Sequence, residues 1–192
     1  MTSESEKKGD VTWHKTFYPD GRVEWETPYV NGSPEGIEHH FWENGSLAQE
    51  TIFRKGRKQG IEKRYRRGGT LDMELPYDNG RLSGHWKIHD AGGRLRNDTP
   101  FVNGLQHGTQ KIYAANGELL VSGEWILGTG VHREYDDRGI LRRSVLYRDG
   151  CKHGPMLEYD EQGRATREWC YVDGLRRDRE EWERAEQRGK RQ

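Results

Sequence analysis

The sequence predicts an all-β fold: an elongated, twisted single-layer antiparallel meander of about seven stacked β-hairpins, with a short C-terminal helix. Seven times a glycine is followed by another glycine eleven residues later, and the first glycines recur every 24 residues, with one step of 22. Apolar residues occupy fixed places within each period, which is typical of repeat proteins whose units bury their apolar faces on their neighbours. The pairs are Gly21 and Gly32, Gly45 and Gly56, Gly69 and Gly80, Gly93 and Gly104, Gly117 and Gly128, Gly139 and Gly150, and Gly163 and Gly174.

The first glycine of each pair is expected to close a three-residue hairpin loop. Pro19, Asp20 and Gly21 suit a type I turn that ends on a left-handed glycine. Such a loop places the residue four positions before the glycine opposite the residue two positions after it. These are an aromatic and an aliphatic residue, such as Phe17 and Val23, and each such pair contributes about 0.2–1 kcal/mol. The second glycine is expected to close a turn of the same kind.

A third apolar position lies eight residues after the first glycine and is aromatic in every unit. All three positions have even offsets, so strand alternation predicts that the aromatic rungs line one face of the sheet. A further glycine usually follows four residues after the second one, where a missing side chain permits close backbone approach. The third position holds Tyr29, Phe53, Tyr77, Phe101, Trp125, Tyr147 and Tyr171.

Three segments follow from this pattern. Residues 1–10 are expected to be a disordered N-terminal tail, and residues 11–174 the repeat domain of seven units of about 24 residues. Residues 175–192 leave the repeat and have the charged composition of a helix. That helix either covers the last open strand edge, which is the simpler interpretation, or forms a partner-binding tail.

Composition limits the function. Only 31% of residues are hydrophobic, 33% are charged and the mean hydropathy is −1.17, which would favour disorder without the repeat. The 32 basic and 32 acidic side chains balance, so we expect no nucleic-acid partner and regard membrane binding as unlikely. The N-terminus lacks an apolar segment and only two cysteines are present, Cys151 and Cys170, which together predict a cytoplasmic protein.

The units resemble MORN repeats, most closely the variant repeats of bacterial proteins. Segments 29–36 (YVNGSPEG) and 101–108 (FVNGLQHG) are similar to the aromatic-x-Asn-Gly-x-x-x-Gly core of that pattern. The resemblance covers about residues 12–174 and implies an elongated sheet of hairpins. It also implies roles in protein assembly, contact with membrane lipids in some members, and toxin neutralisation by antitoxin or immunity proteins in many bacterial ones.

The chain departs from this pattern in four places. His89 fills an aromatic position, Ala165 fills an aliphatic position, and Asp178 stands where an eighth glycine would fall. The connector between Gly128 and Gly130 is also two residues short, which indicates either drift between repeats or a bend that creates a concavity.

No pattern in the sequence indicates catalysis, a cofactor or a metal. The eight histidines include His107 and His153 at one repeated turn position, and no three ligands converge as zinc requires. Carboxylates are spread evenly, and the glycines follow turn geometry rather than a phosphate-binding loop. We therefore expect a protein that is not an enzyme, since an enzyme would need a converging polar pocket.

Apolar residues at odd offsets form the candidate partner-binding site. They are expected on the reverse face, with Ile112 and Leu120 as cross-strand partners, and an exposed apolar patch rimmed by charge is typical of an interaction site. The alternative is that the sheet is curled or covered and these residues are internal packing. The candidates are Trp42, Trp86, Ile88, Ile112, Leu120, Ile140 and Leu146.

The predicted function is that of a non-catalytic protein-binding module, with neutralisation of a partner toxin as its specific form. The alternative is a structural scaffold or a MORN protein that contacts membrane lipids. Neither the partner nor the oligomeric state follows from the sequence.

Overall fold

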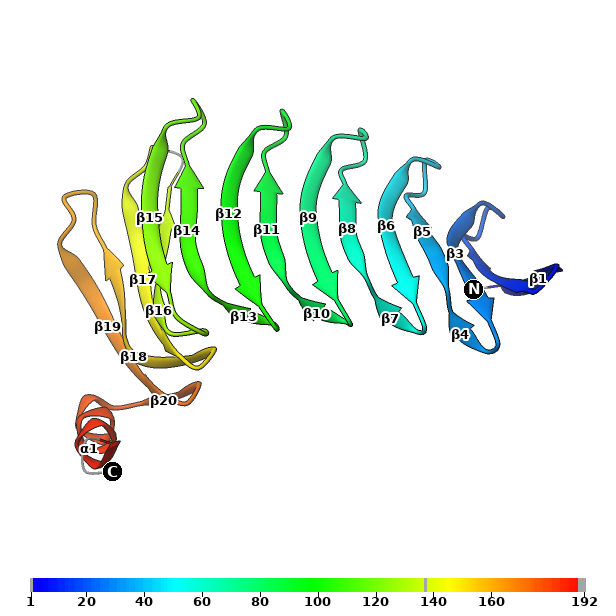
Figure 1. The fold of residues 1–192 in the computed structure, drawn as a ribbon. Helices are drawn as coiled ribbons and strands as arrows, with labels where there is room; N and C mark the ends of the chain where they lie inside the picture. Colours follow the sequence, from blue (N-terminus) through cyan, green and yellow to red (C-terminus); the bar gives the residue numbers. More distant parts are fainter. Residues whose placement is uncertain (1, 137, 190–192) are drawn as a thin grey trace. The chain divides into compact units, whose positions relative to one another are not determined.

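The computed structural model describes residues 2–136 and 138–189, and the chain divides into two compact units, residues 1–104 and 105–192. The division falls inside the single repeat domain expected over residues 11–174. Within each unit the strands form antiparallel hairpins that follow one another in chain order (Figure 1). The predicted all-β meander with a short C-terminal helix is confirmed.

Unit 1 contains four hairpins and one added N-terminal strand. Its strands pair in the order β1-β2-β3-β5-β6-β8-β9-β11-β12, and three two-residue strands fold back onto the strand before them. The bounds are β1 Thr2–Lys8, β2 Val11–Phe17, β3 Val23–Val30, β4 Ser33–Pro34, β5 Gly36–Phe41, β6 Leu47–Arg54, β7 Arg57–Lys58, β8 Gly60–Tyr65, β9 Leu71–Asp78, β10 Arg81–Leu82, β11 Gly84–His89 and β12 Leu95–Val102.

Unit 2 contains three hairpins, a last short strand and the helix. β14 pairs with β15, and β16 to β20 form a five-stranded sheet in chain order. The bounds are β13 Leu105–Gln106, β14 Gly108–Tyr113, β15 Leu119–Trp125, β16 Gly130–Tyr135, β17 Leu141–Arg148, β18 Cys151–Tyr159, β19 Ala165–Val172, β20 Leu175–Arg177 and α1 Arg179–Gly189.

The first turn of each hairpin is the predicted three-residue loop. In the first hairpin the Tyr18 amide donates to the Arg22 carbonyl at 2.9 Å, and the Gly21 amide donates to the Tyr18 carbonyl at 2.9 Å. Gly21 is left-handed, with a φ of 84°. Phe17 lies opposite Val23. The equivalent pairing occurs in all seven hairpins, including those that contain His89 and Ala165.

The second turn differs from the prediction. Val30 pairs with Ser33, so only Asn31 and Gly32 lie between the strands, and both have positive φ, 49° and 76°. This is a two-residue type I′ turn rather than a three-residue loop, and its twist matches that of the flanking strands. The residue before the second glycine is left-handed in all seven units: Asn31, Lys55, Asn79, Asn103, Leu127, Asp149 and Asp173.

A one-residue β-bulge follows each first turn. Phe17 lies opposite Val23 but Thr16 lies opposite Trp25, which leaves Glu24 without a cross-strand partner. An extra residue reverses the face that the rest of the strand presents, because side chains alternate with period two. Tyr29 therefore lies on the opposite face from Phe17, and the prediction that all aromatic rungs share one face is wrong. We call the Phe17 side face I and the Tyr29 side face II.

In three hairpins the bulge residue pairs with the residue that begins the preceding turn. Arg66 Nη2 lies 2.5 Å from Asp72 Oδ1, Asp136 Oδ2 lies 2.7 Å from Arg142 Nη2, and the Asp90–Arg96 pair is 4.0 Å apart. In one hairpin the turn residue is the arginine and the bulge residue the aspartate, and in the other two the order is reversed, so each pair still joins opposite charges. Each pair ties the turn to the strand that leaves it.

Asp136 shows how strongly such a turn is hydrogen-bonded. Its Oδ1 accepts from the Ile140 amide and from the Arg138 amide, each at 3.0 Å. The Ile140 amide, assisted by the Arg142 guanidinium, lowers the pKa of Asp136 to about 2. The carboxylate therefore stays charged well into the acid range.

A row of buried side chains in unit 1 lies on face II. Thr27, Thr51, Leu75 and Thr99 occupy the same repeat position and are 9%, 1%, 8% and 1% exposed. Glu62 is 1% exposed and lies 2.5 Å from Lys58 Nζ and 2.7 Å from Arg64 Nη2. The strands are curved (Figure 1), which lets the side chains of one layer close over each other. The layer therefore needs no second sheet to form an interior.

The expected disordered tail differs in the structure. Thr2–Lys8 form strand β1, which pairs with β2 from Thr2 opposite Phe17 to Lys8 opposite Val11. All seven side chains are exposed, and Glu6 lies 3.2 Å from Lys8 and 3.7 Å from Lys15. The segment is ordered by backbone pairing with β2, while its charged side chains protect the outer edge from further pairing.

The shortened connector coincides with an interruption of strand pairing in unit 2. Ile126 and Thr129 form an isolated bridge, and β16 starts directly at Gly130 in a separate sheet from β15. A Cβ on Gly130 would lie 2.7 Å from the ring of Trp125, which is 2% exposed. Trp125 thus lies directly against the start of β16.

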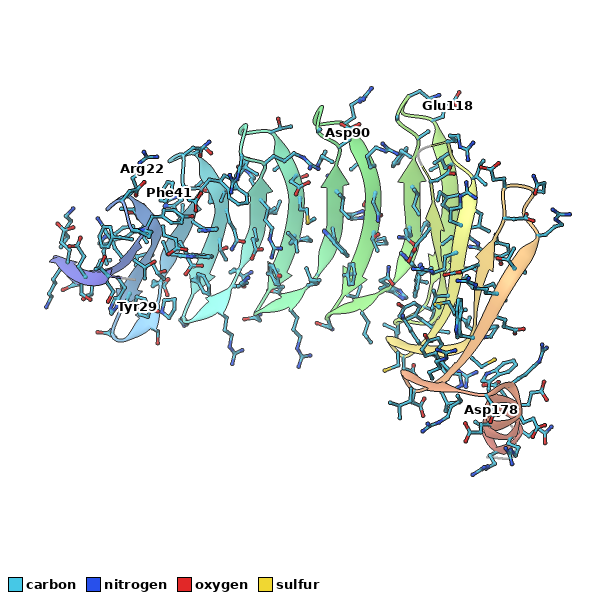
Figure 2. The ribbon with its side chains drawn as sticks, turned by 180° about the vertical axis from the view of Figure 1, so that it is seen from behind. Arg22, Tyr29, Phe41, Asp90, Glu118 and Asp178 are labelled. Carbon is cyan, nitrogen blue, oxygen red and sulfur yellow. The ribbon has the colours of Figure 1, made fainter. Side chains whose placement is uncertain are left out.

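The C-terminal segment ends the unit with a strand and a capped helix. β20 pairs with β19, and Asp178 then accepts from the Glu181 amide at 2.7 Å as the N-cap of α1 (Figure 2). Arg179 lies 3.1 Å from Glu168 of β19, and Glu186 lies 2.8 Å from His153 of β18. Cys170 is 3% exposed, and burial raises the pKa of its thiol. Residues 190–192 of the expected cap lie outside the described residues.

Exchange of two residues tests the left-handed turn position. Lys55 and Asn79 occupy it in neighbouring hairpins, with φ of 50° and 49°. Asparagine adopts this conformation at lower cost, so Lys55→Asn should stabilise the protein and Asn79→Lys should destabilise it, each by about 1 kcal/mol. Urea unfolding of both variants measures the change, and a shift of the same sign in both would contradict the assignment.

The acid dependence of stability tests Asp136. Its folded pKa, about 2, lies below the ordinary value of 3.8, so its contribution is present above pH 3.8 and is lost as pH falls towards 2. Asp136→Asn keeps an oxygen acceptor but no charge. The difference in unfolding free energy between the native protein and this variant should therefore shrink between pH 4 and pH 2. A constant difference across that range rules out the role of the charge.

Candidate functional site

A continuous apolar row crosses face I of unit 1 near the connector ends of the strands. Its cross-strand pairs are Trp13 with Pro28, Ile37 with Ile52, and Ile61 with Pro76. Between hairpins, the Glu35 amide donates to the Pro28 carbonyl at 2.9 Å and the Gln59 amide to the Ile52 carbonyl at 2.8 Å. These bonds keep the hairpins in step. We call Trp13, Pro28, Ile37, Ile52, Ile61 and Pro76 the apolar row.

The centre of the apolar row is open to solvent. Ile37, Ile52 and Ile61 are 40%, 37% and 44% exposed, whereas Thr51 and Glu62, which adjoin Ile52 and Ile61 along their strands, are each 1% exposed on face II. At its N-terminal end the row enters a groove of about 410 Å³, whose wall includes Val11, Trp13, Pro28, Ile37 and His39. Contiguous exposed apolar surface of this kind is typical of an interaction site.

Glycines at the strand starts make room for the apolar row. A Cβ on Gly36 would lie 3.2 Å from Pro28 Cγ, and one on Gly84 would lie 3.1 Å from Pro76 Cβ. Both glycines also have positive φ, 106° and 117°. The close approach predicted at the backbone of these glycines is confirmed. It lets the side chains of Pro28 and Pro76 pack against the start of the next strand.

A pair of arginines extends the apolar row on the same face. Arg54 lies two residues beyond Ile52 on β6 and is opposite Arg57 of β7, so like charges face each other. Facing like charges destabilise a sheet. Among the residues that the structure describes, no carboxylate lies within 4.0 Å of either guanidinium, whereas the equivalent pair of the next hairpin is Asp78 with Arg81. We call Arg54 and Arg57 the arginine pair.

The residues predicted from odd offsets do not form one patch. Trp86, Ile88 and Ile112 lie on face II, whereas Leu146 lies on face I. Ile112 is opposite Val121, not Leu120, because Leu120 is the bulge residue. The seven residues divide between the two units, and all are half-buried: Trp42, Trp86, Ile88, Ile112, Leu120, Ile140 and Leu146.

Trp42 forms a hydrogen bond between neighbouring hairpins. Its indole N–H donates to the Tyr65 carbonyl at 3.1 Å, and the Arg67 guanidinium lies 5.4 Å from the ring centre. Tyr18 in the same repeat position donates to the carbonyl of Phe41 at 2.7 Å (Figure 2), and Arg66 donates to that of His89 at 2.9 Å. This position therefore links one hairpin to the next.

Other predicted residues also have packing contacts. The ring of Trp86 lies 5.9 Å from that of Phe101. Leu120 lies against the following first turn, where a Cβ on Gly139 would be 3.0 Å from its Cδ2. Ile140 lies in that same turn, where its amide donates to Asp136. These contacts support the internal-packing alternative for the residues concerned.

Two histidines of unit 1 lie beside carboxylates. His39 lies 3.1 Å from Glu26, and His85 lies 2.6 Å from Asp98. Within residues 2–136 and 138–189, no three His, Cys, Asp or Glu side chains are grouped as a metal site requires. In the same part of the chain, every helix is too short or too polar to span a bilayer.

The fold makes this chain a β-hairpin repeat protein, and sequence comparison identifies one of its repeats. Residues 106–126, which contain hairpin β14–β15, match the family model described as "MORN repeat variant". No curated protein matches the chain. The structure titled "Crystal structure of GtfA/B complex bound to UDP and GlcNAc" is 12% identical, with a TM-score of 0.27. The match covers 64% of this chain and 24% of that one, and a TM-score this low does not establish a shared fold.

Replacement of Trp42 separates a structural role from a binding role. Trp42→Phe keeps an aromatic ring but removes the donor to the Tyr65 carbonyl. It should lower the free energy of unfolding by about 1 kcal/mol, the ordinary net value of one hydrogen bond. Urea unfolding measures the change. Phe41→Leu is the control, because it alters ring packing but keeps the hydrogen bonds to the Phe41 and Tyr65 carbonyls. Unchanged stability of Trp42→Phe would return Trp42 to the candidates for partner contact.

Proposed function

We propose that this chain is a non-catalytic protein-binding repeat module and that its partner binds face I of unit 1. The observation that carries the proposal is the apolar row, in which three isoleucines from three strands remain 37–44% exposed at one level of the sheet. A soluble protein seldom aligns such residues in register unless something covers them.

The arginine pair indicates the chemistry of the partner. Two facing guanidinium groups without a carboxylate lower the stability of the free protein, but they suit a partner that supplies the missing charge. The partner is therefore a protein surface with apolar side chains beside carboxylates. Charge complementarity of this kind orients the partner and speeds association.

The apolar row supplies part of the energy that specific binding needs. Full burial of an isoleucine side chain stabilises by about 1.5–3 kcal/mol, and roughly a third of that remains to be gained at each partly covered isoleucine. Three such residues would contribute about 2–3 kcal/mol in total. This amount forms the apolar centre of an interface, to which the arginine pair adds directional contacts.

Toxin neutralisation is the specific form of this function that we favour. The match of residues 106–126 to the MORN repeat variant supports it only through the resemblance of such repeats to antitoxin and immunity proteins. It would take place in the cytoplasm, by stoichiometric coverage of the toxin. Co-expression with the product of the adjacent gene tests it: rescue of growth is expected, and an adjacent product that is harmless alone would contradict it.

A scaffold that contacts anionic lipid is the second candidate. The exposed arginine pair favours it, whereas the balance of 32 basic and 32 acidic residues does not. Sedimentation with vesicles of phosphatidylcholine, with and without phosphatidylserine, distinguishes the two. Binding that requires the anionic lipid and is lost in Arg54→Glu would favour the lipid function over the protein partner.

Substitutions in the apolar row test the binding face. Ile52→Glu and Ile61→Glu place a carboxylate in the row and should weaken binding of an affinity-captured partner at least tenfold. Ile126→Glu is the matched control, because Ile126 is 69% exposed and belongs to unit 2. Calorimetric titration of the purified partner measures all three. Equal affinity of the three variants would exclude face I of unit 1 as the binding surface.

A further inference from the structure

A pocket in unit 2 concentrates positive charge between β20 and α1. It has a volume of about 480 Å³ and is lined by Val172, Arg177, Glu181, Arg184, Ala185 and Arg188. Three of these six residues carry a guanidinium group. Val172 and Ala185 give the pocket an apolar wall, so its interior combines cationic and apolar contacts.

The three arginines have no acidic partner. Among the described residues, no carboxylate lies within 4.0 Å of Arg177, Arg184 or Arg188, and Arg184 Nε donates to the Glu180 carbonyl at 3.2 Å. The neighbouring Arg179, by contrast, pairs with Glu168 at 3.1 Å and with Glu183 at 3.2 Å. These two acids are thus engaged outside the pocket.

The one acid in the pocket wall is held by the helix cap. Glu181 donates its amide to Asp178 Oδ1 at 2.7 Å, and its own Oε2 accepts from the Asp178 amide at 3.4 Å. This reciprocal arrangement is a capping box, which directs the carboxylate towards the start of the helix. The pocket wall therefore carries three guanidinium groups and one carboxylate, a net positive charge.

Retention of these charges carries a cost in the free protein. Arg184 and Arg188 are four residues apart on one helix face, and like charges at this spacing destabilise a helix. Arg188 gains from its place in the last turn, where a cation suits the helix dipole, but Arg184 does not. A bound anion would remove the repulsion.

We propose that this pocket binds a phosphate monoester. Guanidinium groups donate paired N–H bonds that match the oxygens of phosphate, and three cations suit a dianion better than a monoanion. The wall formed by Val172 and Ala185 accommodates an apolar substituent on the ester oxygen. The site is independent of the apolar row, which lies in unit 1.

Titration of the full-length protein with phenyl phosphate tests the proposal. Saturable binding with one site per chain is expected by calorimetry, at least fivefold tighter than that of benzoate, a monoanion of similar size. Arg184→Gln and Arg188→Gln should each weaken it at least fivefold. Arg184→Lys, which keeps the charge but not the paired donors, should weaken it less than Arg184→Gln.

Arg176→Gln is the matched control. Arg176 lies on the same strand as Arg177, but its guanidinium sits 5.7 Å from the ring of Trp169 and outside the pocket, so binding should be unchanged. Equal loss in this variant would show a general charge effect and overturn the site. Absence of saturation, or equal affinity for benzoate, would overturn it as well. Inorganic phosphate binding as tightly as phenyl phosphate would also overturn a monoester site, because the apolar wall would then contribute nothing. Far-ultraviolet circular dichroism confirms that each variant is folded.

Discussion

The one-residue bulge after each first turn determines the arrangement of every side chain that follows it. Because Thr16 pairs with Trp25 while Phe17 pairs with Val23, the outgoing strand presents its even-numbered offsets to the other side of the sheet. The burial of Thr27, Thr51 and Thr99 on face II and the apolar row on face I both result from this reversal. A regular hairpin of the same sequence would place Thr51 in solvent and would turn Ile52 away from Ile37.

The sequence predicted what depends on local turn chemistry. The pairing of residues such as Phe17 with Val23 follows from the three-residue loop. The residues of that loop alone set the register of the strands on either side of it. The face on which each side chain lies could not be predicted. No particular residue type marks the bulge, which is Glu24 in one hairpin and Arg96 in another, yet one unpaired residue moves every later side chain of the strand to the other face. The apolar row was missed for this reason. Ile37 and Ile61 lie at even distances from the first glycine of their units and Ile52 at an odd distance, so only the bulge places them on the same face. Glu62 shows the same limit, since its burial depends on Lys58 and Arg64 as partners.

The two proposed binding surfaces share a physical logic. The arginine pair and the arginines of the α1 pocket are both groups of like charge for which no carboxylate of the described residues lies within 4.0 Å. Other arginines lie beside a carboxylate of their own hairpin or of the next strand, as Arg142 does with Asp136 and Arg143 with Glu158. Groups of unpaired like charge beside apolar surface suit a ligand that supplies the opposite charge.

Where a hairpin carries an ion pair between its first turn and its bulge, that pair determines where the chain can be lengthened or shortened. Arg66–Asp72 and Asp90–Arg96 carry the same two charges in opposite order, so each pair is complete only within its own hairpin. A recombination event whose breakpoint lies in a connector transfers both residues of an ion pair together. A break inside a hairpin would join arginine to arginine or aspartate to aspartate. Arrays with whole hairpins inserted or deleted should thus remain foldable, and natural variation in length should occur in steps of one complete unit.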